Sequence, residues 1–302
     1  TGPVRRLLTD IRWPRSYLGG FIVVALALPA IAHDNPGDVI HALTHRMEEG
    51  GVTARLLTAR AFEQSYAGND GAAVEDFNAA LALQPRYGTA LSGLAATLLK
   101  QGKLSEAESV ARRGLVENAS ADRNAPYYAL IAQVYGRAHR WEAARSAWTD
   151  ALESTRPEVD WFLAEAQCLA ELGHYDERVE ALAVARTRNP SVVLHSAWVR
   201  ALIDAHQLEQ ALTEIERRLQ STRWKSSWLI LRAQVHAQQA NQAAQHRDAR
   251  AALDELQLRW GPNPDTRDFH LLRDGAVALE LLGRPDAARH LRDRGVLLDD
   301  VS

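Results

Sequence analysis

A sequence segment that combines a turn, a helix and a helix-terminating end recurs along this chain of 302 residues. It reads GNDGAAVEDFNAALALQP from Gly68, GKLSEAESVARRGLVENA from Gly102 and GHYDERVEALAVARTRNP from Gly173. Each copy follows another helical stretch, and the helix pair recurs with a period of about 34 residues. One short pair of helices cannot cover its own apolar face, so neighbouring pairs must stack to build a continuous core. The repeat therefore restricts the chain to an all-α stacked array.

The composition agrees with this fold class. Ala, Leu, Arg, Glu and Gln dominate the sequence, and these residues lose little conformational entropy in a helix. The formal net charge is −3, from 35 basic and 38 acidic residues. Such a balance indicates neither nucleic acid nor an anionic membrane surface as a partner. The single cysteine, Cys168, cannot form an intrachain disulfide, and its Ala-rich surroundings predict a buried structural residue.

Particular residue types recur at fixed positions of the repeat. Counted from Ala54, the small residues Ala73 and Ala80 stand at the twentieth and twenty-seventh positions. Small side chains there allow the two helices of a pair to approach closely, and Phe77 fills the gap beside them. Gly68, at the fifteenth position, ends the first helix because glycine adopts the left-handed conformation at little cost.

These residues resemble the tetratricopeptide repeat, whose motif places large apolar, small, aromatic, Gly, Ala, aromatic, Ala and Pro residues in this order. The resemblance covers about Val52 to Gly295. It implies a right-handed α-solenoid of about seven helix–turn–helix repeats. Arg60, Glu165 and Arg178 depart from the motif, because apolar or small residues are usual at their positions.

Two segments precede the repeats, which we expect to span residues 52–296 before a short tail at 297–302. Residues 1–32 have a basic start, the apolar run GGFIVVALALPAIA and an A-x-A end, which are typical of a secretory signal peptide. The apolar run is shorter than the roughly 20 residues of a spanning helix, and an uncleaved membrane anchor is the alternative. Residues 33–51 are predicted to form a capping helix over the first repeat, with Asp38 as its N-cap residue.

Either reading of the N-terminus predicts a bacterial protein that is periplasmic or secreted, possibly anchored to the inner membrane. The sequence contains no Gly-rich phosphate loop, H-E-x-x-H, C-x-x-C or G-x-S-x-G motif. We therefore expect a protein that is not an enzyme and needs no cofactor. His41 and His45 are four residues apart, and cleavage after Ala32 would add His33 and a new amino terminus. These groups suggest the alternative function, a metal-binding accessory protein for Cu or Zn.

The resemblance also implies where a partner binds. In this family the first helix of each repeat lines a concave groove, where small residues leave room for a peptide or helix and Gln or Arg supply hydrogen bonds. The residues predicted to line this groove are Thr58, Phe62, Tyr66, Ser92, Lys100, Gln133, Arg137, Gln167, Glu171 and Arg200. The expected function is a non-catalytic protein–protein interaction scaffold of the bacterial cell envelope, which binds another exported protein or peptide.

Overall fold

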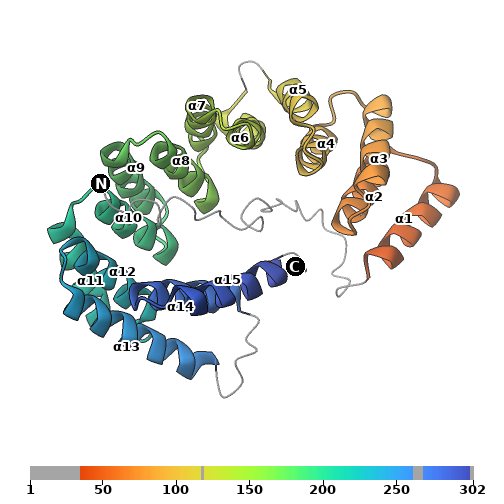
Figure 1. The fold of residues 1–302 in the computed structure, drawn as a ribbon. Coiled ribbons are helices and arrows are strands. Elements are labelled where there is room, and N and C mark those ends of the chain that lie inside the picture. Colours follow the sequence, from red (N-terminus) through yellow and green to blue (C-terminus); the bar gives the residue numbers. More distant parts are fainter. Residues whose placement is uncertain (1–34, 117–118, 261–267, 300–302) are drawn as a thin grey trace. The chain divides into compact units, whose positions relative to one another are not determined.

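A computed structural model describes residues 35–116, 119–260 and 268–299. Within these residues the backbone forms fifteen α-helices and no strand (Figure 1). They belong to two compact units, and the boundary between the units lies between Ala181 and Leu182. The all-α class predicted from the sequence is therefore confirmed.

The N-terminal unit consists of one single helix followed by helix pairs joined through tight turns. Its helices are α1 (Pro36–Gly50), α2 (Ala54–Tyr66), α3 (Asp70–Leu83), α4 (Gly88–Lys100), α5 (Leu104–Gly114), α6 (Ala121–Arg137), α7 (Trp141–Leu152), α8 (Val159–Glu171) and the first half of α9 (Tyr175–Arg188).

The C-terminal unit continues the same order from the second half of α9. Its further helices are α10 (Val192–Asp204), α11 (Leu208–Ser221), α12 (Ser226–Gln238), α13 (Gln242–Trp260), α14 (Phe269–Leu281) and α15 (Pro285–Asp299). Along the described chain, seven helix pairs thus follow α1, which is the predicted number. The last pair shares one apolar cluster with α12 and α13, in which Leu256 of α13 and Leu272 and Ala278 of α14 are buried.

Each pair turns at the fifteenth position of the repeat. Four of these turns use a glycine with positive φ: Gly68 at 83°, Gly102 at 76°, Gly173 at 77° and Gly283 at 71°. Three others place a residue with a side chain in the same conformation: His139 at 55°, His206 at 58° and Ala240 at 55°. The turn is therefore a property of the repeat even where glycine is absent.

The predicted packing positions form the core of the first repeats. Ala73, Phe77 and Ala80 are fully buried on α3. The ring of Phe62 meets the ring of Phe77 edge-on, with centroids 5.2 Å apart. A Cβ atom added to Gly93 would lie 2.4 Å from Cζ of Phe77. The neighbouring helix α4 therefore approaches this pair at a distance that only glycine allows.

Helix α1 starts differently from the prediction. The Oδ1 atom of Asn35 accepts a hydrogen bond from the backbone N–H of Gly37 at 3.2 Å, while Asp38 lies within the first turn. The assignment of Asp38 as the cap was wrong, because Pro36 begins the helix two residues earlier and leaves Asn35 at the capping position. Leu43 and Met47 are buried, and α1 packs against α2 as expected for a capping helix.

Helix α6 is longer than the first helices of the neighbouring pairs, with 17 residues compared with 13 in α4 and 13 in α8. The extra residues continue the helix, and Asp122 in its first turn binds the segment that follows α7. Its Oδ1 atom accepts hydrogen bonds from Ser154 Oγ and from the backbone N–H of Thr155, each at 2.7 Å. These bonds lower the pKa of Asp122 because they favour the ionised carboxylate.

The unusual Arg60 is explained by a partner on the second helix of its own repeat. Its Nε and Nη2 atoms donate to the two carboxylate oxygens of Asp76, both at 2.7 Å. Arg232 and Asp248 repeat this arrangement with the same 16-residue separation, at 2.7 and 2.9 Å. An apolar position of the motif is thus replaced by a bidentate ion pair in two repeats.

Residues 1–34, which carry the signal-peptide or anchor prediction, and residues 300–302 of the predicted tail lie outside the described residues. In the part of the chain that is described, no helix is sufficiently long and apolar to cross a membrane.

Candidate functional site

In the N-terminal unit, the first helices of the first three pairs contact one another. Helix α4 lies between α2 and α6 and contacts both. Nine of the ten residues predicted to bind a partner belong to α2, α4, α6 and α8 of this unit. Arg200 belongs to α10 of the C-terminal unit. We call the exposed and half-buried predicted residues of these four helices the inner face.

On α2, the three predicted residues have different environments. Tyr66, at the end of the helix, is 82% exposed, and Phe62 is half-buried against Phe77. Thr58 is only 2% exposed. The prediction that Thr58 contacts a partner was wrong, because α1, α3 and α4 all pack on α2 and leave little of its surface free. The aromatic pair Phe62 and Tyr66 is what α2 offers to a partner.

Lys100 and Arg137 occupy the same repeat position and make the same kind of contact. Lys100 Nζ donates to the carbonyl oxygen of Ser65 at 3.0 Å and pairs with Asp70 Oδ1 at 2.9 Å. Arg137 Nη1 donates to the carbonyl oxygen of Leu99. Each cation therefore binds a C-terminal carbonyl of the preceding first helix, where the helix dipole favours positive charge.

The other predicted residues on α4, α6 and α8 are polar. Ser92 Oγ donates to the carbonyl oxygen of Thr89 at 3.1 Å, and Gln133 is half-buried on α6. On α8, Gln167 Nε2 donates to Glu171 Oε1 at 2.6 Å. Burial raises the pKa of Asp160 at the start of the same helix. The inner face thus combines two aromatic rings with amide, hydroxyl and carboxylate groups.

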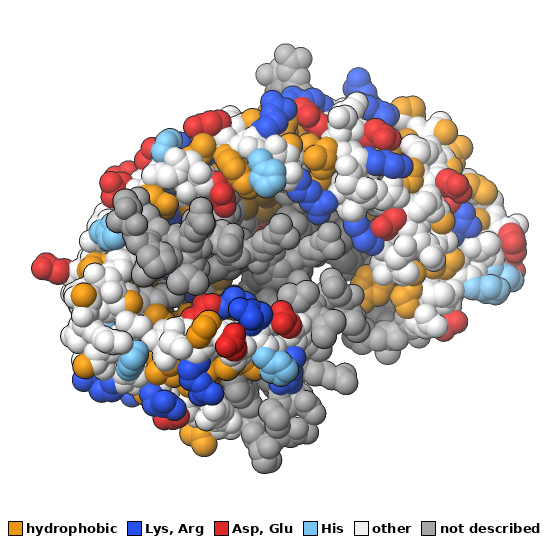
Figure 2. Space-filling model, viewed as in Figure 1, with side chains coloured by type: hydrophobic (Ala, Val, Ile, Leu, Met, Phe, Trp, Pro, Cys, Tyr) orange, Lys and Arg blue, Asp and Glu red, His pale blue; other side chains and the backbone are white. Residues whose placement is uncertain are grey.

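Charges of both signs are mixed on the visible surface. Figure 2 shows Lys and Arg side chains interspersed with Asp and Glu side chains among the coloured residues. Large areas of a single sign, which would attract nucleic acid over long distances, do not gather on this face of the described residues.

The proposed metal ligands do not form a cluster in the described part of the chain. His41 and His45 are exposed on α1, and His45 Nδ1 lies 3.3 Å from Glu49 Oε2. Among the described residues, no three or more His, Cys, Asp or Glu side chains are grouped so that they could hold a metal ion. His33 lies outside these residues. The Cu or Zn alternative therefore gains no support from the structure.

Comparison with known proteins identifies the repeats. The family model for the tetratricopeptide repeat matches residues 58–126 and 130–192. These matched residues are tetratricopeptide repeats. The matched residues include the first helix pairs, in which the motif is most regular, whereas the later pairs depart from it more.

Solved structures with this repeat share the fold at low sequence identity. A tetratricopeptide repeat protein from Parabacteroides merdae is 18% identical, and the match covers 83% of this chain and 93% of that one with a TM-score of 0.50. The protein pilF of Pseudomonas aeruginosa is 14% identical, with 78% of this chain and 99% of that one covered and a TM-score of 0.51. No curated protein matches the sequence significantly.

Sequence reasoning missed the carbonyl contacts of the inner face. A cation stands at the thirteenth position in both the second and the third repeat, as Lys100 and Arg137. This recurrence was a signal in the sequence for a structural contact. A residue that only lines a groove would not need to keep a positive charge from one repeat to the next. It points to a bond that the repeat itself makes rather than to a ligand.

Proposed function

We propose that this protein is a non-catalytic interaction scaffold, and that a peptide or helix of a partner protein binds the inner face of its N-terminal unit. The observation that carries the proposal is the row formed by α2, α4 and α6, in which α4 contacts the other two helices, with Tyr66 82% exposed beside the half-buried Phe62. Exposed aromatic rings are frequent anchors of protein interfaces, since they bury a large area at a small cost in conformational entropy.

The polar groups of the inner face would fix the orientation of the bound segment. Gln133 can both donate and accept a hydrogen bond, so it suits the backbone of a peptide. Lys100 and Arg137 contribute differently, because their head groups already bind Ser65, Asp70 and the carbonyl oxygen of Leu99. They hold neighbouring repeats in position and thereby define the surface that the partner meets.

We further propose that the partner is an exported protein and that the scaffold acts in the bacterial cell envelope. This part rests on residues 1–32, which combine a basic start, an apolar run and an A-x-A end. N-terminal sequencing of the protein recovered from its source cells tests it. A mature chain that starts at His33 supports export, and a cytosolic protein with residues 1–32 intact would refute it.

A comparative capture experiment tests the inner face. Wild-type protein and the variant Tyr66→Ser, Gln133→Ser are used to capture partners from extracts of the source organism. We expect one partner to be lost in the variant, because the substitutions remove an exposed anchor and a hydrogen-bonding group. Glu106→Ser, on the exposed surface of α5, is the matched control and should retain the partner. Equal capture by all three proteins would rule out this surface.

A further inference from the structure

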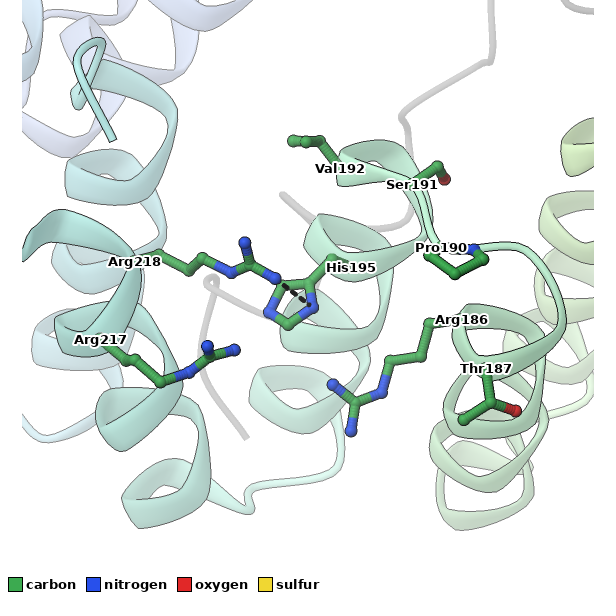
Figure 3. A pocket seen from close by; sticks show the side chains of 8 residues that line it. All are labelled: Arg186, Thr187, Pro190, Ser191, Val192, His195, Arg217 and Arg218. Atoms are coloured by element: carbon green, nitrogen blue, oxygen red, sulfur yellow. Dashed lines mark hydrogen bonds between the residues drawn. The ribbon is translucent and has the colours of Figure 1, made fainter. Parts of the chain in front are cut away.

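A pocket of about 420 Å³ lies within the C-terminal unit, between the end of α9, the start of α10 and the end of α11. The close-up in Figure 3 shows three arginine side chains that extend toward His195, Arg186 from α9 and Arg217 and Arg218 from α11. The side chains that line this arginine pocket are Arg186, Thr187, Pro190, Ser191, Val192, His195, Arg217 and Arg218. These eight residues, all in the described part of the chain, include no carboxylate.

Arg186 is held in place by an aromatic ring. Its guanidinium carbon lies 3.7 Å from the centroid of the Trp198 ring, which is a close cation–π contact. The Nε atom of Arg186 is buried and has no hydrogen-bond acceptor. A buried donor without an acceptor is unfavourable, and an oxyanion in the pocket would remove this defect.

Arg218 is fixed by His195 and Glu214. Its Nη2 atom lies 3.1 Å from Nδ1 of His195, and its Nε atom lies 3.5 Å from Glu214 Oε1. His195 Nε2 lies 2.5 Å from the same Glu214 oxygen. Arg217 also pairs with Glu214. One carboxylate therefore serves two arginines and a histidine, while Arg186 pairs with no carboxylate of the described residues.

The balance of charge in the pocket is positive. Burial lowers the pKa of His195, and the nearby Arg218 acts in the same direction against the opposing effect of Glu214. The three guanidinium groups then face the single negative charge of Glu214. The pocket also lies at the start of α10, where Ser191 Oγ accepts from the backbone N–H of Leu194 at 3.2 Å. The partial positive charge of a helix N-terminus adds to that of the arginines.

We propose that the arginine pocket binds an oxyanion, either a phosphate or a carboxylate group. The planar guanidinium of Arg186 suits bidentate contact with two oxygens of such a group, and Arg217 and Arg218 supply further donors from the opposite side. The volume exceeds that of a bare anion, and Pro190 and the exposed Val192 form an apolar wall. An oxyanion carried on a short aliphatic stem, such as an acidic side chain of a peptide, fits this wall.

Titration calorimetry of the full-length protein at low ionic strength tests the proposal. The probes are inorganic phosphate, glutarate, and a short peptide with blocked ends that contains one glutamate, compared with the same peptide containing glutamine. We expect saturable binding at one site by phosphate or by the glutamate probes. Stronger binding of phosphate indicates a free or esterified phosphate as the natural ligand, and stronger binding of the glutamate peptide indicates an acidic side chain.

Three variants that each replace one arginine by glutamine, and so remove the same charge, locate the site. Arg186→Gln should weaken binding by about tenfold or more, since it removes a bidentate partner. Arg217→Gln, at a residue whose side chain is 60% exposed, should weaken binding without disturbing the fold. Arg250→Gln removes the same charge from the exposed surface of α13 and should leave affinity unchanged. Circular dichroism verifies that each variant is folded.

Two results would overturn the proposal: no saturable binding of any probe to the wild type, or equal weakening by Arg217→Gln and Arg250→Gln. The outcome is separate from that of the inner face. Tyr66→Ser, Gln133→Ser should bind phosphate and glutarate like the wild type, even where partner capture is lost.

Discussion

Three residues bend the chain in a conformation that glycine adopts more easily. His139, His206 and Ala240 have φ of 55°, 58° and 55°, at the repeat position where other pairs use glycine. A Cβ atom makes this conformation unfavourable by roughly 1–2 kcal/mol. The gain from substituting glycine is reduced by the larger conformational entropy of glycine in the unfolded chain.

The substitution Ala240→Gly should therefore stabilise the protein by about 0.5 kcal/mol. The matched control is Ala237→Gly, three residues earlier within α12, which should destabilise it by about 0.5–1 kcal/mol. Urea unfolding monitored by circular dichroism measures both effects. If Ala240→Gly lowered the unfolding midpoint as much as the control, the assignment of a left-handed backbone conformation to Ala240 would be wrong.

The lone cysteine is predicted to be chemically inert in the folded protein. Cys168 is 3% exposed on α8, and burial, with a contribution from Glu165, raises its pKa to about 12. The reactive thiolate is then almost absent at pH 8. We expect iodoacetamide to leave the native protein unmodified and to label it fully in denaturant, as measured by mass spectrometry. Rapid labelling of the native protein at pH 8 would contradict this burial.

Within the repeats, a bidentate ion pair replaces apolar packing between the two helices of a pair. Asp76 is 8% exposed and receives both hydrogen bonds from Arg60. Asp76→Ala leaves the guanidinium without its partner and should cost about 3 kcal/mol. The double variant Asp76→Ala, Arg60→Leu should recover much of this loss, since it removes the unpaired charge as well. Equal unfolding midpoints for the single and the double variant would show that the unpaired charge of Arg60 does not cause the loss of stability.

The junction of α10 and α11 should be sensitive to acid. The lowered pKa of His195 means that the unfolded chain takes up a proton on this residue before the folded protein does. Stability is therefore lost as pH falls below the ordinary histidine value of about 6.5.

The melting temperatures of wild type and His195→Asn at pH 7.5 and pH 5 measure this contribution. We expect the wild type to lose more stability than the variant on acidification, because the variant cannot take up that proton. An equal loss in both proteins would show that His195 is not the group responsible.

Repeat periodicity predicted the number and order of the helix pairs, because each position of the motif makes the same kind of packing contact in every repeat. It predicted the ends of helices less well, since these depend on single capping contacts. Asn35 rather than Asp38 caps α1, and Asp122 extends α6 by bonding to Ser154 and Thr155. These contacts depend on single residues, which the repeat period does not determine.

At the scale of the whole chain, the candidate site could be predicted only in part. The repeat position gives the side of a helix on which a residue stands, and this placed Tyr66 and Gln133 on accessible surface. It does not give the reach of a long side chain into the next repeat, so it missed the contacts of Lys100 and Arg137. It also could not reveal the arginine pocket, because Arg186, Arg217 and Arg218 come from two different helices and arginine is not a residue type that the repeat motif specifies.

The central claim is that the inner face of the N-terminal unit binds a partner protein. Photo-crosslinking in the source cells tests it most directly, with a benzoylphenylalanine introduced singly at Tyr66, Gln133 or Glu106. The account predicts that the probes at Tyr66 and Gln133 crosslink to the same protein, while the probe at Glu106 on α5 does not. Crosslinks to a protein from Glu106 alone, or from none of the three positions, would contradict it.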